Sequence, residues 1–127
     1  MFVIRRVWEV LPRKARLAAS IAREIADLYE AAGQRPGVQV YFNGGTLPGT
    51  TNRVYMEWTE ERIESTFRAD RVAPEGVAEL APRLRELTTD QWVEFHELMT
   101  PEKVQEWPGA ERTTPHPEAG TRSPTGG

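Results

Sequence analysis

Two short segments of alternating apolar and polar residues place the strongest constraint on what this chain can fold into. In residues 38–43 every second side chain is apolar, and residues 53–59 repeat the pattern. Successive side chains of a β-strand point to opposite faces, so each segment predicts a strand with one buried and one polar face. The sequence between them, GGTLPGTTN, is rich in turn-forming residues. Together they predict an antiparallel hairpin with a long loop.

The segments before this hairpin predict one strand and one helix. Residues 2–10 are rich in β-forming side chains and predict a strand with apolar groups on both faces. Residues 13–32 repeat apolar side chains at spacings of three and four, with Leu17 at the start of the stripe. This spacing predicts an amphipathic helix, with Pro12 in its first turn and Gly33 just beyond its end.

The segments after the hairpin are harder to interpret. Residues 74–87 predict a second helix, which Pro82 would kink or delay, whereas residues 60–73 are ambiguous. Residues 91–99 fit either a strand or a helix. We expect a strand, because it completes the order βαββαβ, followed by a short helix from Thr100 to Trp107.

Composition limits the domain organisation and the classes of function. We expect one soluble α+β domain in residues 1–107 and a disordered tail in residues 108–127. The tail has four prolines, four glycines and no large apolar side chain, so it cannot bury enough surface to fold. A net charge of −3 gives no support for nucleic-acid binding, and no apolar run is long enough for a membrane span. The chain has no cysteine, which excludes disulfides and fits a reducing cytoplasm.

The order of elements resembles the dimeric α+β barrel superfamily, which includes the antibiotic-biosynthesis monooxygenase-like and NIPSNAP-like proteins. The residues that carry this likeness are VIRRVWEV with PRKARLAASIAREI after it, then YFNGG, NRVYMEWTEE and WVEFHELMTPEK. The resemblance implies a ferredoxin-like fold with a four-stranded antiparallel sheet, paired with a second copy into a barrel. It implies a homodimer that acts on a small molecule, and members include cofactor-free monooxygenases, polyketide cyclases, isomerases and haem-degrading enzymes.

A sheet with helices on one face only leaves its other face for chemistry. The apolar set expected to meet the helices is Val38, Val40, Phe42, Val54, Met56 and Trp58. The opposite face is expected to carry Gln39, Tyr41, Asn43, Arg53, Tyr55, Glu57, Glu94 and His96. On the first strand, either Ile4, Arg6 and Trp8 or Arg5, Val7 and Glu9 join this polar face. A barrel would enclose the face into a cleft with aromatic walls.

The candidate catalytic residues are those that could move a proton or stabilise an oxyanion. His96 is the one histidine of the domain, and histidine is a residue type that can give or take a proton in catalysis. Glu57 or Glu94 could orient His96 or act as the base, and Tyr41 and Tyr55 could hydrogen-bond a carbonyl or enolate. The alternatives are a surface histidine and a cross-strand pair of tyrosines that stabilises the sheet.

The candidate substrate-binding residues are Asn43, Arg6, Trp8, Trp92 and Arg53. Asn43 could donate to an oxyanion, although asparagine before two glycines is more often turn chemistry. No metal ligand spacing is present and no cofactor is expected. We therefore expect a small cofactor-independent enzyme acting on an aromatic or polyketide-like substrate by acid–base chemistry, either cyclisation or isomerisation or a cofactor-free monooxygenation. The alternative is a non-catalytic small-molecule-binding or accessory protein.

Overall fold

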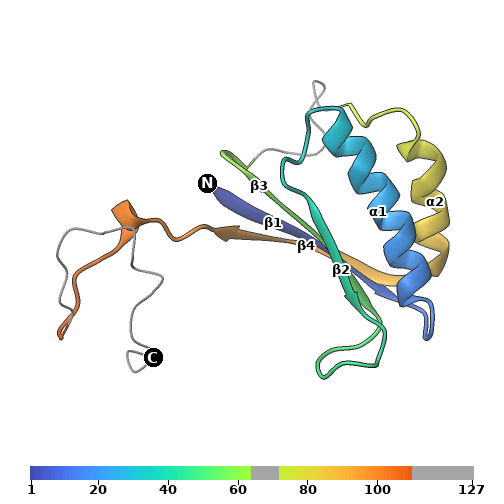
Figure 1. The fold of residues 1–127 in the computed structure, drawn as a ribbon, viewed down its shortest axis with the longest axis horizontal. Helices are drawn as coiled ribbons and strands as arrows, with labels where there is room; N and C mark the ends of the chain where they lie inside the picture. Colours follow the sequence, from blue (N-terminus) through green and yellow to red (C-terminus); the bar gives the residue numbers. More distant parts are fainter. Residues whose placement is uncertain (64–71, 110–127) are drawn as a thin grey trace.

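The computed structural model of the protein describes residues 1–63 and 72–109 (Figure 1). Residues 110–127 of the expected disordered tail and residues 64–71 of the ambiguous segment 60–73 lie outside these ranges. The described elements follow the order βαββαβ: β1 (Phe2–Val10), α1 (Ala15–Ala31), β2 (Gln39–Asn43), β3 (Arg53–Glu60), α2 (Val77–Leu87) and β4 (Thr88–Glu97). The strands form one four-stranded sheet in the order β2-β3-β1-β4, and every pair is antiparallel. The predicted α+β fold is therefore confirmed.

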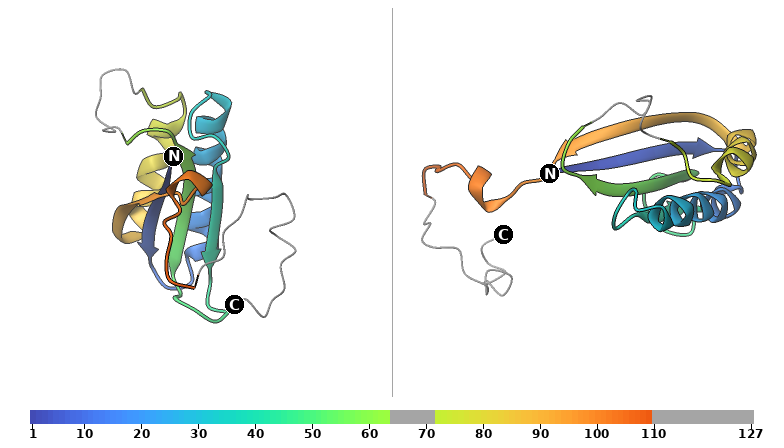
Figure 2. Two further views of the ribbon diagram at one scale, coloured as in Figure 1. Left: turned by 90° about the vertical axis from the view of Figure 1, so that its left-hand side faces the viewer. Right: turned by 90° about the horizontal axis from the view of Figure 1, so that it is seen from above.

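Both helices cover the same face of the sheet, so the molecule has two layers (Figure 2). The core between the layers includes Val54, Met56 and Trp58 of β3, as the alternating pattern predicted, and Ile4 and Trp8 of β1. Burial of these apolar side chains is the main favourable term in the folding free energy.

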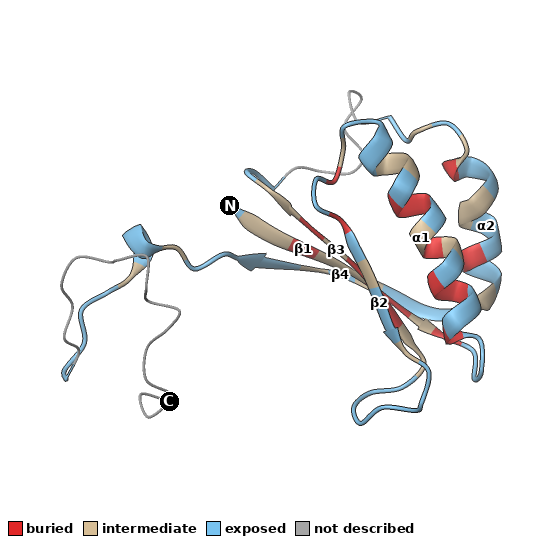
Figure 3. Cartoon of the chain, viewed as in Figure 1, coloured by how far each residue is buried: buried red, intermediate tan, exposed pale blue. Residues whose placement is uncertain are grey.

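Helix α1 rests on the sheet through alanines together with Ile25 of its predicted stripe, whereas Leu17 of that stripe does not reach the sheet. Ala18, Ala22 and Ala26 are completely buried, whereas Leu17 is 50% exposed. Figure 3 shows the buried residues of α1 along its sheet-facing side. Small side chains let the helix backbone approach the bulky Trp8 and Met56 side chains closely, since a packed interior leaves no room for two large layers. The expected position of Leu17 on the buried face is wrong.

Three expected boundaries also differ from the structure. Pro12 lies in a turn before α1, because the next residue, Arg13, has a positive φ of 67° that no helix can contain. Pro82 lies inside α2, which begins before it, at Val77. The expected last helix is one 3₁₀ turn, Pro101–Lys103, and Trp107 lies beyond it with 61% of its surface exposed.

The ambiguity over residues 91–99 is resolved in favour of a strand. β4 runs from Thr88 to Glu97 and pairs with β1, although Leu98 and Met99 lie outside it. The strand directly follows α2 with no intervening loop. No helix within the described residues is long and apolar enough to cross a membrane.

Candidate functional site

The strand register gathers most of the predicted site residues on the sheet face without helices, which we call the open face. Arg5 of β1 pairs with Glu57 of β3 and with Glu94 of β4, and Val7 pairs with Tyr55 and Trp92. Directly paired residues point to the same side of a sheet. The open face therefore carries Gln39, Tyr41, Asn43, Arg53, Tyr55, Glu57, Arg5, Val7, Glu9, Trp92, Glu94 and His96.

Glu94 lies at the centre of a hydrogen-bond network on the open face. The Trp92 indole N–H donates to its Oε2 at 3.0 Å, and the Arg5 Nε–H donates to its Oε1 at 3.0 Å. His96 Nε2 lies 3.2 Å from the same Oε1. These contacts, led by Trp92 and Arg5, lower the pKa of Glu94 to about 2. Glu94 is thus ionised at neutral pH and too weak a base to accept a proton, but it can orient His96.

A second hydrogen-bonded pair occupies the other side of Arg5. The Tyr41 hydroxyl donates to Glu57 Oε1 at 2.8 Å, and burial together with this bond raises the pKa of Tyr41. Hydrogen bonds to Tyr41 and Glu94 raise the pKa of Arg5. A continuous chain of contacts therefore runs from His96 through Glu94, Arg5 and Tyr41 to Glu57.

Aromatic rings form a row across the open face beside this chain. The rings of Tyr41 and Tyr55 are stacked, with centroids 4.9 Å apart and planes inclined by 15°. The Arg53 guanidinium lies 5.1 Å from the centre of the Trp92 ring and 3.4 Å from a Glu9 oxygen. Val7 lies in this row, between Tyr55 and Trp92, and is 1% exposed. The tyrosine pair and the charged side chains of this face therefore contact one another.

Two predicted site residues have other surroundings on this face. The Asn43 amide donates to the carbonyls of Leu47 and Pro48 and accepts from the Gly45 N–H, so its polar atoms hold the hairpin loop. It is turn chemistry, as the alternative interpretation had it. His96 is 59% exposed, and its described polar contact is Glu94.

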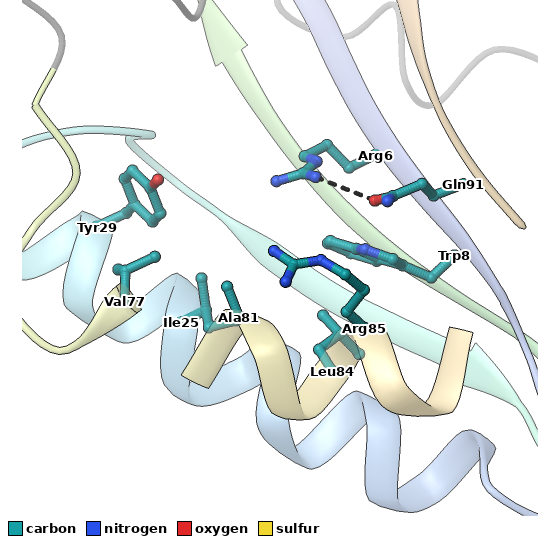
Figure 4. Close-up of a pocket in the computed structure, with 9 residues that line it drawn as sticks. All are labelled: Arg6, Trp8, Ile25, Tyr29, Val77, Ala81, Leu84, Arg85 and Gln91. Carbon is teal, nitrogen blue, oxygen red and sulfur yellow. Dashed lines mark hydrogen bonds between the residues drawn. The ribbon is translucent and has the colours of Figure 1, made fainter. Parts of the chain in front are cut away.

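Arg6 and Trp8 do not lie on the open face, contrary to one of the two arrangements considered for the first strand. Their neighbours Arg5 and Val7 occupy that face, and strand alternation turns Arg6 and Trp8 toward the helices. There they line a pocket of about 140 Å³, which we call the helix–sheet pocket. Figure 4 shows its lining residues, which come from β1, β4, α1 and α2: Arg6, Trp8, Ile25, Tyr29, Val77, Ala81, Leu84, Arg85 and Gln91.

The helix–sheet pocket combines an apolar floor with two cations. Ile25, Val77 and Leu84 belong to the core or pack in it, whereas Arg6 and Arg85 point into the pocket (Figure 4). Tyr29, Arg85 and Gln91 were not among the residues expected to form a site, because no local sequence pattern brings them beside Arg6 and Trp8. The sequence signal that could have placed Arg6 and Trp8 on the helix side is their spacing: they lie two and four residues after the core residue Ile4, and alternate residues of a strand share a face.

The residues that line the pocket are suited to binding a small molecule. Its lining contains no carboxylate, imidazole or thiol. Within residues 1–63 and 72–109, no group of three potential metal ligands among histidine and acidic side chains is close enough to hold an ion.

Comparisons with known proteins support the fold. No family model and no curated protein matches the chain. Among solved structures, a NIPSNAP family protein from Agrobacterium tumefaciens superposes with a TM-score of 0.56 and 19% identity, covering 79% of this chain and 86% of that one. The chain has the fold of the NIPSNAP-like structures. The resemblance expected from the sequence is thereby confirmed at the level of fold.

Two further structures show the same likeness. An uncharacterized NIPSNAP domain protein from Burkholderia xenovorans has a TM-score of 0.55 and 17% identity, covering 84% of this chain and 100% of that one. An antibiotic biosynthesis monooxygenase has a TM-score of 0.52 and 14% identity, covering 79% of this chain and 100% of that one. At these identities the likeness concerns the ferredoxin-like α+β fold and not an activity.

The low pKa of Glu94 leads to a pH-dependent prediction. Its pKa in the folded chain lies below the ordinary 4.5, so its interactions stabilise the fold above that pH and are lost as the pH falls toward about 2. We expect Glu94→Gln to lower the free energy of unfolding by about 1 kcal/mol at pH 7. Urea unfolding should show this difference shrinking between pH 4.5 and 2.

The matched control for this prediction is Glu86→Gln, the same chemical change at an exposed position of α2. It should alter stability by less than about 0.5 kcal/mol at either pH. A Glu94→Gln difference that stays constant as the pH falls would show that the carboxylate is not held in its charged form by this network.

Proposed function

We propose that this protein binds a small aromatic or polyketide-like molecule in the helix–sheet pocket, in a carrier or accessory role. The observation that carries the proposal is the pocket itself, an indentation lined by the Trp8 and Tyr29 rings and an apolar floor. Concave, mostly apolar surfaces with a few placed polar groups are the usual sites for small molecules. Its volume of about 140 Å³ is close to the roughly 150 Å³ of an engineered cavity that binds benzene. One ring would therefore occupy it.

The absence of an acid–base residue among the pocket lining favours binding over turnover. Tyr29 is the one lining residue with a group that general acid–base catalysis uses, because the two arginines stay protonated. General acid–base catalysis normally uses a histidine or carboxyl within hydrogen-bond reach of the substrate. His96 lies on the opposite face of the sheet and is out of reach of a molecule held beside Trp8.

Filling the pocket provides the test of this proposal. Ala81 lines the pocket and Ala78 is exposed on the same helix, so Ala81→Leu and Ala78→Leu make the same change inside and outside it. Ligand-observed NMR with single-ring aromatic fragments should detect millimolar binding to the natural protein, a range typical of fragments of this size. Ala81→Leu should abolish the signal and Ala78→Leu should keep it. Equal binding by the two variants would place the fragments elsewhere.

We also propose that the protein is a homodimer whose two open faces pack together. Tyr41, Tyr55 and Trp92 present large aromatic surfaces there, and aromatic residues are enriched where proteins associate. The charged groups between them already have partners within the chain, including Arg5 with Glu94 and Arg53 with Glu9. Such a surface can be covered by a second copy with little loss of solvation, because its charges are not left unpaired.

A charge placed on the open face should separate the two copies. Tyr41 is 37% exposed on this face, and Leu17 is exposed on the helix surface. Native mass spectrometry of the natural protein should give twice the chain mass of 14.4 kDa. Tyr41→Lys should give the single chain and Leu17→Lys should leave the dimer intact. A monomeric natural protein would contradict the pairing of open faces.

A second candidate function is a cofactor-independent enzyme whose active site lies on the open face enclosed by this dimer. The observation that favours it is the hydrogen bond between His96 and the permanently ionised Glu94. Glu94 would orient His96 as the base that takes a proton from a β-keto or polyphenolic substrate. The hydroxyl of Tyr55, beside the Tyr41–Glu57 pair, would donate to the oxygen that becomes negative. Return of the proton from His96 to another carbon completes an isomerisation. In a ring closure the carbanion instead attacks a carbonyl carbon of the same molecule, and the resulting alkoxide oxygen takes the proton back from His96.

This candidate predicts large kinetic effects at the open face. His96→Ala should lower turnover of a β-keto or polyphenolic substrate by about 100-fold or more, the range typical of general acid–base groups. Tyr55→Phe should also lower turnover, whereas Glu86→Gln on the helix surface should leave it unchanged. Unchanged turnover in both open-face variants would eliminate these roles and leave the binding function in place.

A further inference from the structure

We propose that the molecule bound in the helix–sheet pocket is a planar oxygen anion, such as an aromatic carboxylate or an ionised phenol or enol, held by Arg6 and Arg85. This inference rests on the proposed binding function and specifies the chemical class of its ligand. Four observations carry it: the charge of the pocket lining, the missing ion-pair partners, the partial burial of Arg6, and the aromatic ring beside it.

The lining of the pocket is positively charged in a chain that is negative overall. Arg6 and Arg85 are its charged residues, and no aspartate or glutamate lines it. The whole chain has 19 acidic and 16 basic residues, for a net charge of −3. Two guanidinium groups in one small indentation repel each other, and a bound anion would remove that repulsion.

Neither pocket arginine forms an ion pair with another described residue. Arg5, Arg23 and Arg53 each have a carboxylate partner in the chain, namely Glu94, Asp27 and Glu9. The polar contact of Arg6 is a long hydrogen bond of 3.5 Å to the neutral Gln91 amide. Figure 4 shows this contact and the Arg6 guanidinium reaching over the pocket.

Partial burial makes the missing partner of Arg6 costly. Arg6 comes from the middle of the central strand, and its burial lowers the pKa of its guanidinium. A cation removed from water needs compensation by an anion or by hydrogen bonds. Its position 4.8 Å from the centre of the Trp8 ring supplies part of this through a cation–π interaction. A ligand carboxylate or enolate would supply the rest.

The shape of the site selects a flat anion. Guanidinium groups donate two parallel hydrogen bonds to a planar pair of oxygens, and the Gln91 amide can add a third donor. The Trp8 ring and the floor of Ile25, Val77 and Leu84 accommodate an aromatic or conjugated body beside the charged group. A molecule with its charge delocalised over a ring or a carboxylate fits both parts of the pocket.

The experiment compares benzoate with benzamide, which has nearly the same shape and no charge. Titrations followed by NMR of the natural full-length chain should show benzoate binding about tenfold more tightly than benzamide. Arg85→Gln and Arg6→Gln should each reduce this preference to about threefold or less. Arg83→Gln, the same change on the exposed side of α2, should preserve it. Since Arg85 is exposed, its variant tests the inference even if Arg6→Gln fails to fold.

An indicator acid distinguishes a carboxylate ligand from an ionised hydroxyl. 4-Nitrophenol ionises near neutral pH with a visible change in absorbance, and a site that prefers the anion lowers the apparent pKa of the bound dye. A lowered pKa that Arg85→Gln removes would extend the ligand class to phenolates and enolates, whereas an unshifted dye would restrict it to carboxylates.

The remaining outcomes separate the two proposals. Equal affinity of the natural protein for benzoate and benzamide would overturn the anion inference and leave small-molecule binding in place. A benzoate preference that survives both Arg6→Gln and Arg85→Gln would overturn the assignment of these arginines. No binding of either probe up to about 10 mM would overturn both the inference and the proposed pocket function.

Discussion

The register of β1, one of the two inner strands of the sheet, determines which polar side chains of the neighbouring strands lie on each face of the sheet. β1 pairs with β3 on one side and with β4 on the other, so its register fixes the faces of both neighbours. Packing of α1 through its alanines then makes one face dry, and Ile4 and Trp8 are buried there. A shift of β1 by one residue would exchange the two faces, placing Arg5 in the core and Trp8 on the surface. Such a shift is unfavourable because it would place the charged Arg5 and Glu9 against the helices in place of Ile4 and Trp8.

Arg5 and Arg6, adjacent in the sequence, have opposite environments because of this register. Arg5 lies on the open face, where Glu94 and Tyr41 raise its pKa. Arg6 lies on the helix side, where burial lowers its pKa and no described carboxylate compensates its charge. A charged residue that has ion-pair or hydrogen-bond partners within the chain stabilises local structure, whereas one without a carboxylate partner is available to bind an anionic ligand. The two arginines therefore indicate different roles for the two faces of the sheet.

The alternation of apolar and polar residues made the fold predictable from the sequence, together with the hairpin residues that lie on the open face. In the hairpin, apolar and polar residues separate cleanly, so the open-face positions of Tyr41, Tyr55 and Glu57 follow from the pattern. β1 could not be assigned in this way, because Ile4 and Trp8 on one face and Val7 on the other are all apolar and all buried. Both arrangements satisfied the pattern, and the choice between them depends on pairing with distant strands.

The parts of the site that sequence reasoning missed depend on contacts between distant segments. The helix–sheet pocket joins β1, β4, α1 and α2, and no local pattern brings Arg6 near Arg85. Of the predicted apolar stripe of α1, Leu17 lies outside the face that the structure buries, whereas Ile25 lies within it. Asn43 could be interpreted from its local sequence, because asparagine before two glycines is typical of a turn. Its side chain does form hydrogen bonds within its own loop.

The open face and the helix side of the sheet also differ in how much hydration of charged groups is lost when another molecule covers them. On the open face, Glu94, Arg5, Tyr41 and Glu57 are linked to one another before any partner arrives. Covering such a network removes little hydration that its own contacts have not already replaced, so a broad protein surface can pack on it. On the helix side, the pocket holds two cations that a small anion would neutralise. The two proposals thus give the open face to assembly and the opposite face to recognition of a small molecule. The solved structures that share this fold do so at 14–19% identity, so their likeness concerns the fold and carries no argument about the charged side chains of either face.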